Sequence, residues 1–182
     1  MEMGGDVELS STLETLKIRL RELGYSCELN PGCTKSRIDW LSSKIGIVLP
    51  DSLSSLLQCA DGETFESAGF GAFGFDCRFL DASEIDSTIQ RIKDVQAFFG
   101  EIELETIGPV KSLYWNPRWI PFIASTYVGY FVDLDPDEGG VVGQVLRAEV
   151  EEGLLSVESE SIHAFLDDFA SGKRALPQRA DA

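Results

Sequence analysis

His163 is the only histidine of the 182-residue chain, so a serine or cysteine nucleophile would have to take it as its base. No Gly-x-Ser-x-Gly motif accompanies it, and a catalytic site needs an orienting group and an oxyanion site as well as a base. We therefore predict a surface or packing role for His163 and no enzyme activity. A hydrolase that uses His163 or a pair of carboxylates stays an unsupported alternative.

The four cysteines offer no metal-ligand spacing. No Cys-x-x-Cys pair occurs among Cys27, Cys33, Cys59 and Cys77, and a single histidine does not complete a zinc ligand set. A chain of this length can also form a stable hydrophobic core without disulfide bonds. We expect no metal, no disulfide and no cofactor, and we expect Cys59 to pack within an apolar helix.

Two short motifs match ligand-binding patterns only in part. Gly69-Phe70-Gly71-Ala72-Phe73-Gly74 has the spacing of a phosphate-cradling loop, but such a loop follows a strand and opens a helix, which the flanking residues do not predict. Tight turns or a close backbone approach explain these glycines better. Asp133-x-Asp135-x-Asp137 resembles the start of a calcium loop, yet Glu138 and Gln144 occupy the positions that require glycine and glutamate. A hairpin turn fits this stretch better.

The charge of the chain is strongly negative and uneven. There are 31 acidic and 15 basic residues, for a net charge of −16, which repels nucleic acid and anionic lipid and attracts basic partners. Residues 130–168 contain eleven acids and one base, Arg147. This segment is either a solvated face that aids solubility or a partner-binding surface. The candidate contacts are the acids at two predicted turns: Asp133, Asp135, Asp137, Glu138, Glu149, Glu151 and Glu152.

The order of the predicted elements indicates an α+β fold. Five helices are predicted: from the capping box Ser11-x-x-Glu14 to residue 23, over residues 36–45, over 49–60, from the capping box Asp81-x-x-Glu84 to Phe99, and over 160–170. We expect Phe99 to face inward. Strands are predicted over 73–80, 119–124, 127–134, 141–150 and 154–157. N-terminal helices, a central antiparallel meander and a closing helix make one domain over residues 1–172, with residues 173–182 as a disordered tail.

Targeting and membrane-spanning signals are not expected. The first six residues, Met1–Asp6, have no basic or apolar stretch typical of a secretory signal. The longest apolar runs are strand-sized, well short of the roughly 20 residues that cross a bilayer. We therefore predict a cytoplasmic protein with no membrane partner.

Two stretches resemble the SUKH superfamily, in particular its Smi/Knr branch, over about residues 36–171. The first runs from Ile47-Val48-Leu49-Pro50 through Leu56-Leu57 to Asp61-Gly62. The second contains Trp115-Asn116-Pro117-Arg118-Trp119-Ile120-Pro121-Phe122, Gly129, Asp133-Leu134-Asp135-Pro136, Gly139-Gly140 and Gly143-Gln144-Val145. Tyr130 departs from the pattern, which usually has Asn or Asp there. We predict that Trp119, Ile120 and Phe122 belong to the core and that Asp135-Pro136 with Gly139-Gly140 forms a hairpin turn.

The resemblance implies an α+β domain without known catalytic residues or cofactor. Bacterial members are mostly immunity proteins that neutralise polymorphic toxins, many of them nucleases, so the resemblance implies a toxin as the partner. The negative charge of the chain predicts that this toxin is basic. The alternative is an intracellular regulatory or scaffold protein of the Smi/Knr kind that has no toxin partner.

Overall fold

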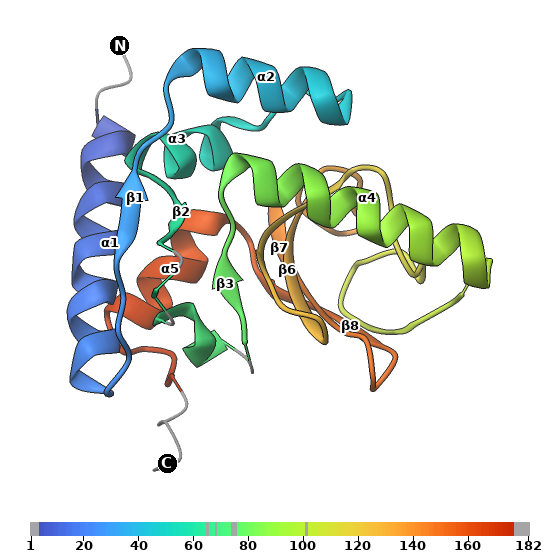
Figure 1. The fold of residues 1–182 in the computed structure, drawn as a ribbon. Helices are drawn as coiled ribbons and strands as arrows, with labels where there is room; N and C mark the ends of the chain where they lie inside the picture. The colour runs from blue at the N-terminus through green and yellow to red at the C-terminus, as the bar shows by residue number, and fades with distance from the viewer. Residues whose placement is uncertain (1–3, 65, 68, 74–75, 101, 177–182) are drawn as a thin grey trace.

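The computed structural model describes residues 4–64, 66–67, 69–73, 76–100 and 102–176, which form helices on both faces of a six-stranded sheet (Figure 1). The helices are α1 (Gly4–Glu22), α2 (Lys35–Ile45), α3 (Asp51–Cys59), α4 (Ala82–Phe99), α5 (Ile162–Ala170) and the short 3₁₀ helix η1 (Gly69–Phe73). The strands are β1 (Leu29–Pro31), β2 (Ala60–Glu63), β3 (Arg78–Phe79), β4 (Glu105–Ile107), β5 (Trp119–Ala124), β6 (Val128–Asp133), β7 (Gln144–Glu149) and β8 (Leu154–Ser159). The predicted α+β class is confirmed. None of the helices in these ranges has the length and apolarity to cross a membrane.

The main sheet has the strand order β3-β5-β6-β7-β8-β4, and β1 pairs with β2 in a small separate sheet. Strands β5 to β8 form the predicted antiparallel meander. One edge lies outside this meander, because β4, a strand that the sequence did not predict, pairs with β8 in parallel. The reason lies in the connection: α4 carries the chain from β3 at one edge of the sheet to β4 at the other, where β4 enters in the same direction as β8.

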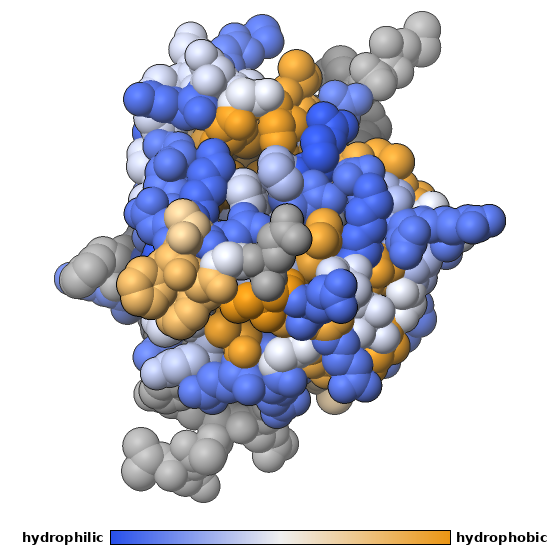
Figure 2. Space-filling view, turned by 90° about the vertical axis from the view of Figure 1, so that its right-hand side faces the viewer, coloured by the Kyte–Doolittle hydropathy of each residue, from blue (hydrophilic) through white to orange (hydrophobic). Residues whose placement is uncertain are grey.

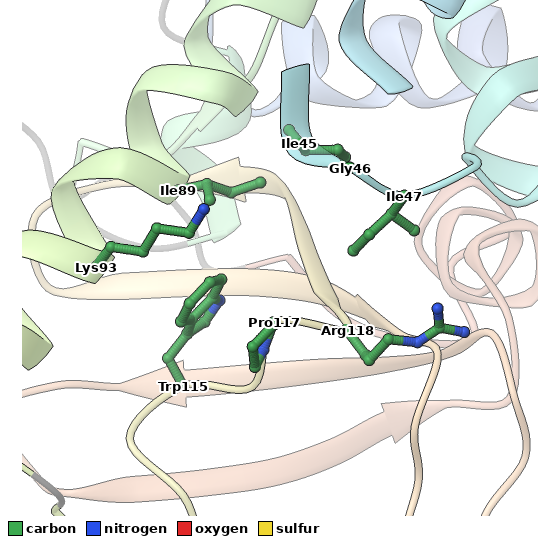
Figure 3. Close-up of a pocket in the computed structure, with 8 residues that line it drawn as sticks. All are labelled: Ile45, Gly46, Ile47, Ile89, Lys93, Trp115, Pro117 and Arg118. Carbon is green, nitrogen blue, oxygen red and sulfur yellow. The ribbon is translucent and has the colours of Figure 1, made fainter. Parts of the chain in front are cut away.

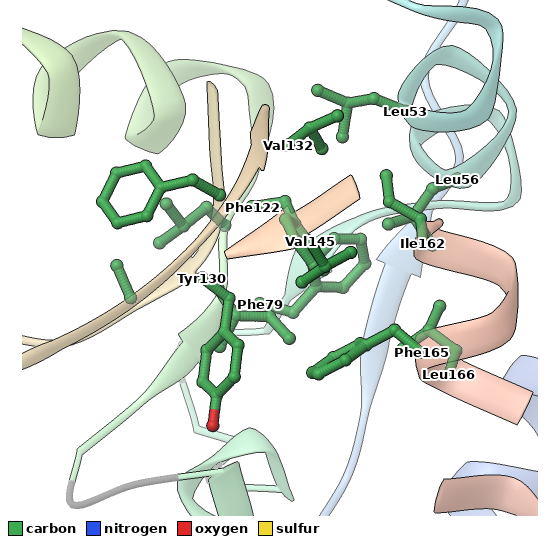
Figure 4. Packing of buried hydrophobic residues seen from close by; sticks show 14 of the residues in the cluster. Leu53, Leu56, Phe79, Phe122, Tyr130, Val132, Val145, Ile162, Phe165 and Leu166 are labelled. Atoms are coloured by element: carbon green, nitrogen blue, oxygen red, sulfur yellow. The ribbon is translucent and has the colours of Figure 1, made fainter. Parts of the chain in front are cut away.

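One face of the sheet packs against α5, with α1 and α3 behind it (Figure 4). The ring of Phe165 on α5 lies 5.2 Å from Tyr130 and 6.0 Å from Phe122, measured between centroids. Such aromatic pairs add to the burial of apolar area that stabilises the core. Tyr130 therefore lies inside β6 and not in a turn, and its hydroxyl donates to the carbonyl of Phe73 at 2.9 Å. The predicted closing helix is confirmed, and it begins after Ser161, whose side chain caps it.

The other face packs against α4. The predicted capping box is present: Asp81 accepts from the backbone of Glu84, whose side chain accepts from the Asp81 N–H. Ile85 and Ile89 are buried. Phe99, predicted to face inward, is exposed instead, because the last turn of α4 runs past the strands that the helix covers (Figure 1).

Helix α1 begins earlier than its predicted capping box. Ser11 and Glu14 lie within the helix, which starts at Gly4. Leu9 is buried together with Leu13, and the four-residue spacing extends the apolar stripe by one turn. Packing of this stripe therefore sets the start of the helix, and the local capping signal does not.

The segment between β2 and α4 is less regular than predicted. The strand expected over residues 73–80 is reduced to β3, and η1 lies before it, while residues 74 and 75 lie outside the described part of the chain. The close backbone approach predicted for the glycines is confirmed at Gly69, where a Cβ would lie 2.4 Å from Cβ of Cys27. The short strands β1, β2 and β4 were not predicted, since three or four residues carry too little alternation to reveal a strand.

The predicted disordered tail is wrong for its first four residues. Leu176 is buried, and Nη1 of Arg174 lies 2.8 Å from Oε2 of Glu158. The guanidinium of Arg174 also lies over the ring of Phe169. The rest of the predicted tail, residues 177–182, lies outside the described residues.

Candidate functional site

Asp133, one of the predicted partner contacts, is buried at the end of β6 with no exposed area. Its carboxylate accepts hydrogen bonds from Nε1 of Trp119 at 2.9 Å, from Nε2 of Gln144 at 2.9 Å and from the backbone N–H of Asp135 at 2.8 Å. Burial raises the pKa of Asp133, and these donors oppose that rise without cancelling it. The prediction is corrected here: Asp133 stabilises the sheet and is not available to a partner. Trp119, Ile120 and Phe122 are buried as predicted.

The remaining acids of the β6–β7 connection differ in their exposure to solvent and in whether they form ion pairs. The predicted hairpin turn is confirmed between the two strands. Asp135 is half-buried, its Oδ2 lies 2.6 Å from Nζ of Lys111 and 2.8 Å from Nδ2 of Asn116, and these partners lower its pKa. Asp137 and Glu138 are exposed, and neither has a cationic partner among the described residues. Two of the four acids predicted here therefore remain accessible and unpaired.

The acids of the β7–β8 turn also differ in exposure and ion pairing. Glu149 is half-buried and pairs with Arg147, whereas Glu151 and Glu152 at the tip are exposed and form no ion pair within the described ranges. Across residues 130–168, six of the eleven acids are exposed and form no ion pair with any residue that the structure describes: Asp137, Glu138, Glu151, Glu152, Glu160 and Asp167. The charge of this segment is therefore only partly neutralised by the fold.

The two predicted clusters lie at opposite ends of the sheet. The chain leaves β6 at Asp133 and returns along β7, so the turn after Glu149 lies one strand length away from Asp137 and Glu138. A strand of six residues spans about 20 Å. The two turns therefore do not form one continuous surface, as a single stretch of sequence had suggested.

The β7–β8 turn is joined by acids from an earlier part of the chain. The N–H of Glu105 donates to the carbonyl of Gly153 at 2.8 Å, and Glu105 pairs with Leu154 in parallel register. Glu103 and Glu105 are exposed and, like the turn acids, have no cationic partner among the residues described. We call Glu103, Glu105, Glu151 and Glu152 the acidic end surface. Sequence reasoning missed the first two because only the parallel pairing of β4 with β8 brings them to this turn.

Exposed apolar side chains accompany the acidic end surface. The N–H of Val150 donates to Tyr127 O at 2.9 Å, so these two exposed residues lie side by side. Val150 and Val95 of α4 line one shallow hollow of about 250 Å³. Beyond Val95, α4 ends in Phe98 and Phe99, which are 82% and 65% exposed. Figure 2 looks onto this side of the molecule and shows hydrophobic residues gathered between hydrophilic ones.

We call Phe98, Phe99, Ile102, Tyr127 and Val150 the exposed apolar group. Ile102 belongs to it through the backbone, since its carbonyl accepts from the N–H of Tyr114, which lines the same hollow as Val95. Exposed aromatic residues beside charged ones are typical of protein interfaces, where apolar contacts lie inside a polar rim.

Within the described part of the chain, the residues that carry nucleophilic or metal chemistry are not assembled into a site. His163 lines a hollow with Ser52 and Ser55, but no hydrogen bond joins its ring to either hydroxyl in the described structure. Burial raises the pKa of Cys27 and Cys33 to about 12 and that of Cys77 to about 11, which disfavours the reactive thiolate. The described residues contain no group of three metal-ligating side chains, and the hydrogen bonds of Asp133 occupy the first position of the calcium-like motif.

Comparison with known proteins agrees with this architecture. The model of the SMI1 / KNR4 family (SUKH-1) matches residues 32–168, three-quarters of the chain. No curated protein matches the sequence. The match contains both stretches that carried the resemblance, together with α2 to β8 and most of α5. The resemblance is confirmed: the chain belongs to the SMI1/KNR4 (SUKH-1) family.

Proposed function

We propose that the chain is an immunity protein that neutralises a basic protein toxin by docking on it through the acidic end surface. One observation carries this proposal. Four exposed glutamates from two separate segments meet at one end of the sheet, beside exposed aromatic side chains, and no cation of the described structure neutralises them.

The chemistry of this surface favours a basic partner over a second copy of the chain. Each copy has a net charge of −16, so two acidic end surfaces repel one another at short range. A cationic protein is attracted to the same surface, and the exposed apolar group supplies area to bury once contact is made. A nuclease toxin fits this description, because an enzyme that binds a phosphate backbone presents a basic surface of its own.

The test reads the open reading frames beside the gene for this chain, expresses any basic protein encoded there in a cell, and measures whether this chain protects that cell. Co-expression of the wild-type chain is expected to restore growth and to yield a one-to-one complex. The variant E151K/E152K reverses two charges of the acidic end surface and is expected to lose protection. The matched control is D137K/E138K, which makes the same change of charge at an exposed turn on the opposite end of the sheet and is expected to protect.

Two results would contradict the proposal in different ways. Equal protection by both variants would show that the interface lies elsewhere and that these acids only keep the protein soluble. A wild-type chain that neither binds nor protects would favour the regulatory or scaffold alternative, in which the same family fold has no toxin partner.

A further inference from the structure

A second hollow lies on the α4 side of the molecule, and none of the acids of the proposed interface lines it. It has a volume of about 280 Å³ and lies between the C-terminal end of α2, the middle of α4 and the loop before β5 (Figure 3). Its walls combine apolar and cationic side chains: Ile45, Gly46, Ile47, Ile89, Lys93, Trp115, Pro117 and Arg118. Both stretches that resemble the family contribute to it, the first through Ile47 and the second through residues 115–118.

Two cations of this hollow have no carboxylate partner. Neither Nζ of Lys93 nor the guanidinium of Arg118 lies within 4.0 Å of an acidic oxygen in the described structure, although the chain has twice as many acids as bases. Arg118 has only a minor lowering effect on the pKa of Asp135. The carboxylate of Asp135 pairs directly with Lys111. The hollow is therefore a locally positive site on a strongly negative protein.

Trp115 supplies an unused hydrogen-bond donor at the same place. The residue is 5% exposed, and its indole Nε1 is buried with no acceptor among the described residues. Trp119, four residues later, donates its equivalent atom to Asp133. A buried donor without an acceptor costs free energy, which an acceptor brought by a ligand would recover. In Figure 3 the nitrogen edge of the Trp115 ring faces the side of the hollow formed by Ile47, Pro117 and Arg118.

These features select one chemical class of ligand. The cations require a negative charge, the indole requires an acceptor, and the walls formed by Ile45, Ile47 and Ile89 require an apolar body. Inorganic phosphate lacks the apolar body, and a neutral amide lacks the charge. A carboxylate on a short hydrocarbon chain has all three properties, and guanidinium groups bind carboxylates well. The volume lies just below the roughly 300 Å³ at which drug-sized pockets begin, so the ligand is small.

We propose that this hollow binds a small organic carboxylate, either a free acid or the C-terminal carboxylate of a peptide, between Lys93 and Arg118 and against the indole N–H of Trp115. Nζ of Lys93 lies over the Trp115 ring, 5.6 Å from its centroid, so one of the two cations stands directly beside the indole that would donate to the ligand. This site is independent of the proposed toxin interface, and either proposal can fail without the other.

The experiment follows the indole N–H resonance of Trp115 in a ¹⁵N-labelled full chain by NMR, with W115F to assign it. The probes are 4-methylpentanoate, its neutral amide 4-methylpentanamide, inorganic phosphate, and a short peptide ending in leucine with a free or an amidated C-terminus. The free acid is expected to shift the resonance saturably, with the millimolar affinity typical of so small a ligand. The amides and phosphate are expected to bind at least about tenfold more weakly, because a charge-assisted contact or the apolar contact is lost.

The variants K93M and R118Q are each expected to weaken binding of the acid by about tenfold. The matched control K44M removes one exposed cation next to Ile45 that does not line the hollow, and it is expected to leave binding unchanged. Binding of the free acid identifies a metabolite-like ligand, whereas binding of only the free-carboxylate peptide identifies a chain terminus. The proposal is overturned if no carboxylate shifts Trp115, if the amides or phosphate bind equally well, or if K93M and R118Q behave like K44M.

Discussion

Nε1 of Trp119 and Oδ1 of Asp133 lie 2.9 Å apart at the point where β5 and β6 pair, and both residues are buried. The carboxylate also accepts from Gln144 on β7, so one acidic side chain connects three neighbouring strands. A buried carboxylate is costly unless its oxygens are fully hydrogen-bonded. The pair therefore explains why an apparently free acid of the sequence belongs to the core of the fold.

We predict that Trp119→Ala folds poorly, with the free energy of unfolding lowered by about 3 to 5 kcal/mol as for other buried tryptophans. Trp119→Phe keeps most of the ring but removes the donor, and its cost is expected to be smaller, about 1 to 3 kcal/mol. Urea denaturation measures both. A stable Trp119→Ala variant that only lost partner binding would show that Trp119 is a contact residue and not a core anchor.

The Asp133 example shows where sequence reasoning stops. Local signals, such as the capping box of Asp81 and Glu84, were enough to place α4, since all their partners lie within one turn. The burial of Asp133 depends instead on Trp119 and Gln144, which lie on two other strands. Its sequence context, three alternating aspartates before two glycines, is the same whether the first carboxylate points inward or outward.

The acidic end surface was only half predictable for a related reason. Glu151 and Glu152 stand in an evident turn, and turn tips are exposed. Glu103 and Glu105 reach that turn only because α4 crosses the whole sheet and β4 then pairs with β8 in parallel. No local pattern encodes such a pairing, and the same crossover leaves Phe98 and Phe99 beyond the edge of the sheet.

We predict that Asp133 and Asp135 titrate on opposite sides of the ordinary aspartate pKa. Burial raises the pKa of Asp133, so its contribution to stability is complete below the ordinary value and is lost as the pH rises through the raised one. Lys111 and then Asn116 lower the pKa of Asp135, so its contribution is complete above the ordinary value and is lost as the pH falls through the lowered one.

The side-chain carboxyl ¹³C shifts, followed against pH by NMR, measure both aspartates. Lys111→Met is expected to move the pKa of Asp135 upward and to leave that of Asp133 almost unchanged, since Lys111 contacts only Asp135. Titration of Asp135 above Asp133 would contradict the prediction.

We predict that Cys27, Cys33 and Cys77 of the native protein react slowly with a thiol reagent such as DTNB. All three are buried and burial raises their pKa values, so both access and the thiolate fraction are low. Cys59 is half-buried and is expected to react first. Four rapid reactions before unfolding would contradict this.

We also predict that thermal melts of the protein with and without chelator or reductant coincide. A shift of the melting temperature above about 5 °C would reveal a metal or disulfide.

The last prediction separates electrostatic attraction from direct contact at the proposed toxin interface. Association of the wild-type chain with its basic partner, followed by stopped flow, is expected to slow steeply with salt, because the Debye length shrinks from about 30 Å at 0.01 M to about 8 Å at 0.15 M. E151K/E152K is expected to slow association more than D137K/E138K, since the two variants carry the same charge but only the first changes the acidic end surface.

F98S/F99S alters exposed residues of the exposed apolar group and should cost little stability, roughly 0.5 kcal/mol or less per residue. Because it removes buried contact area and no charge, it is expected to leave association almost unchanged and to accelerate dissociation. If F98S/F99S leaves dissociation as it was and both charge reversals slow association equally, the partner senses only the net charge of the chain, and this end of the sheet is not the interface.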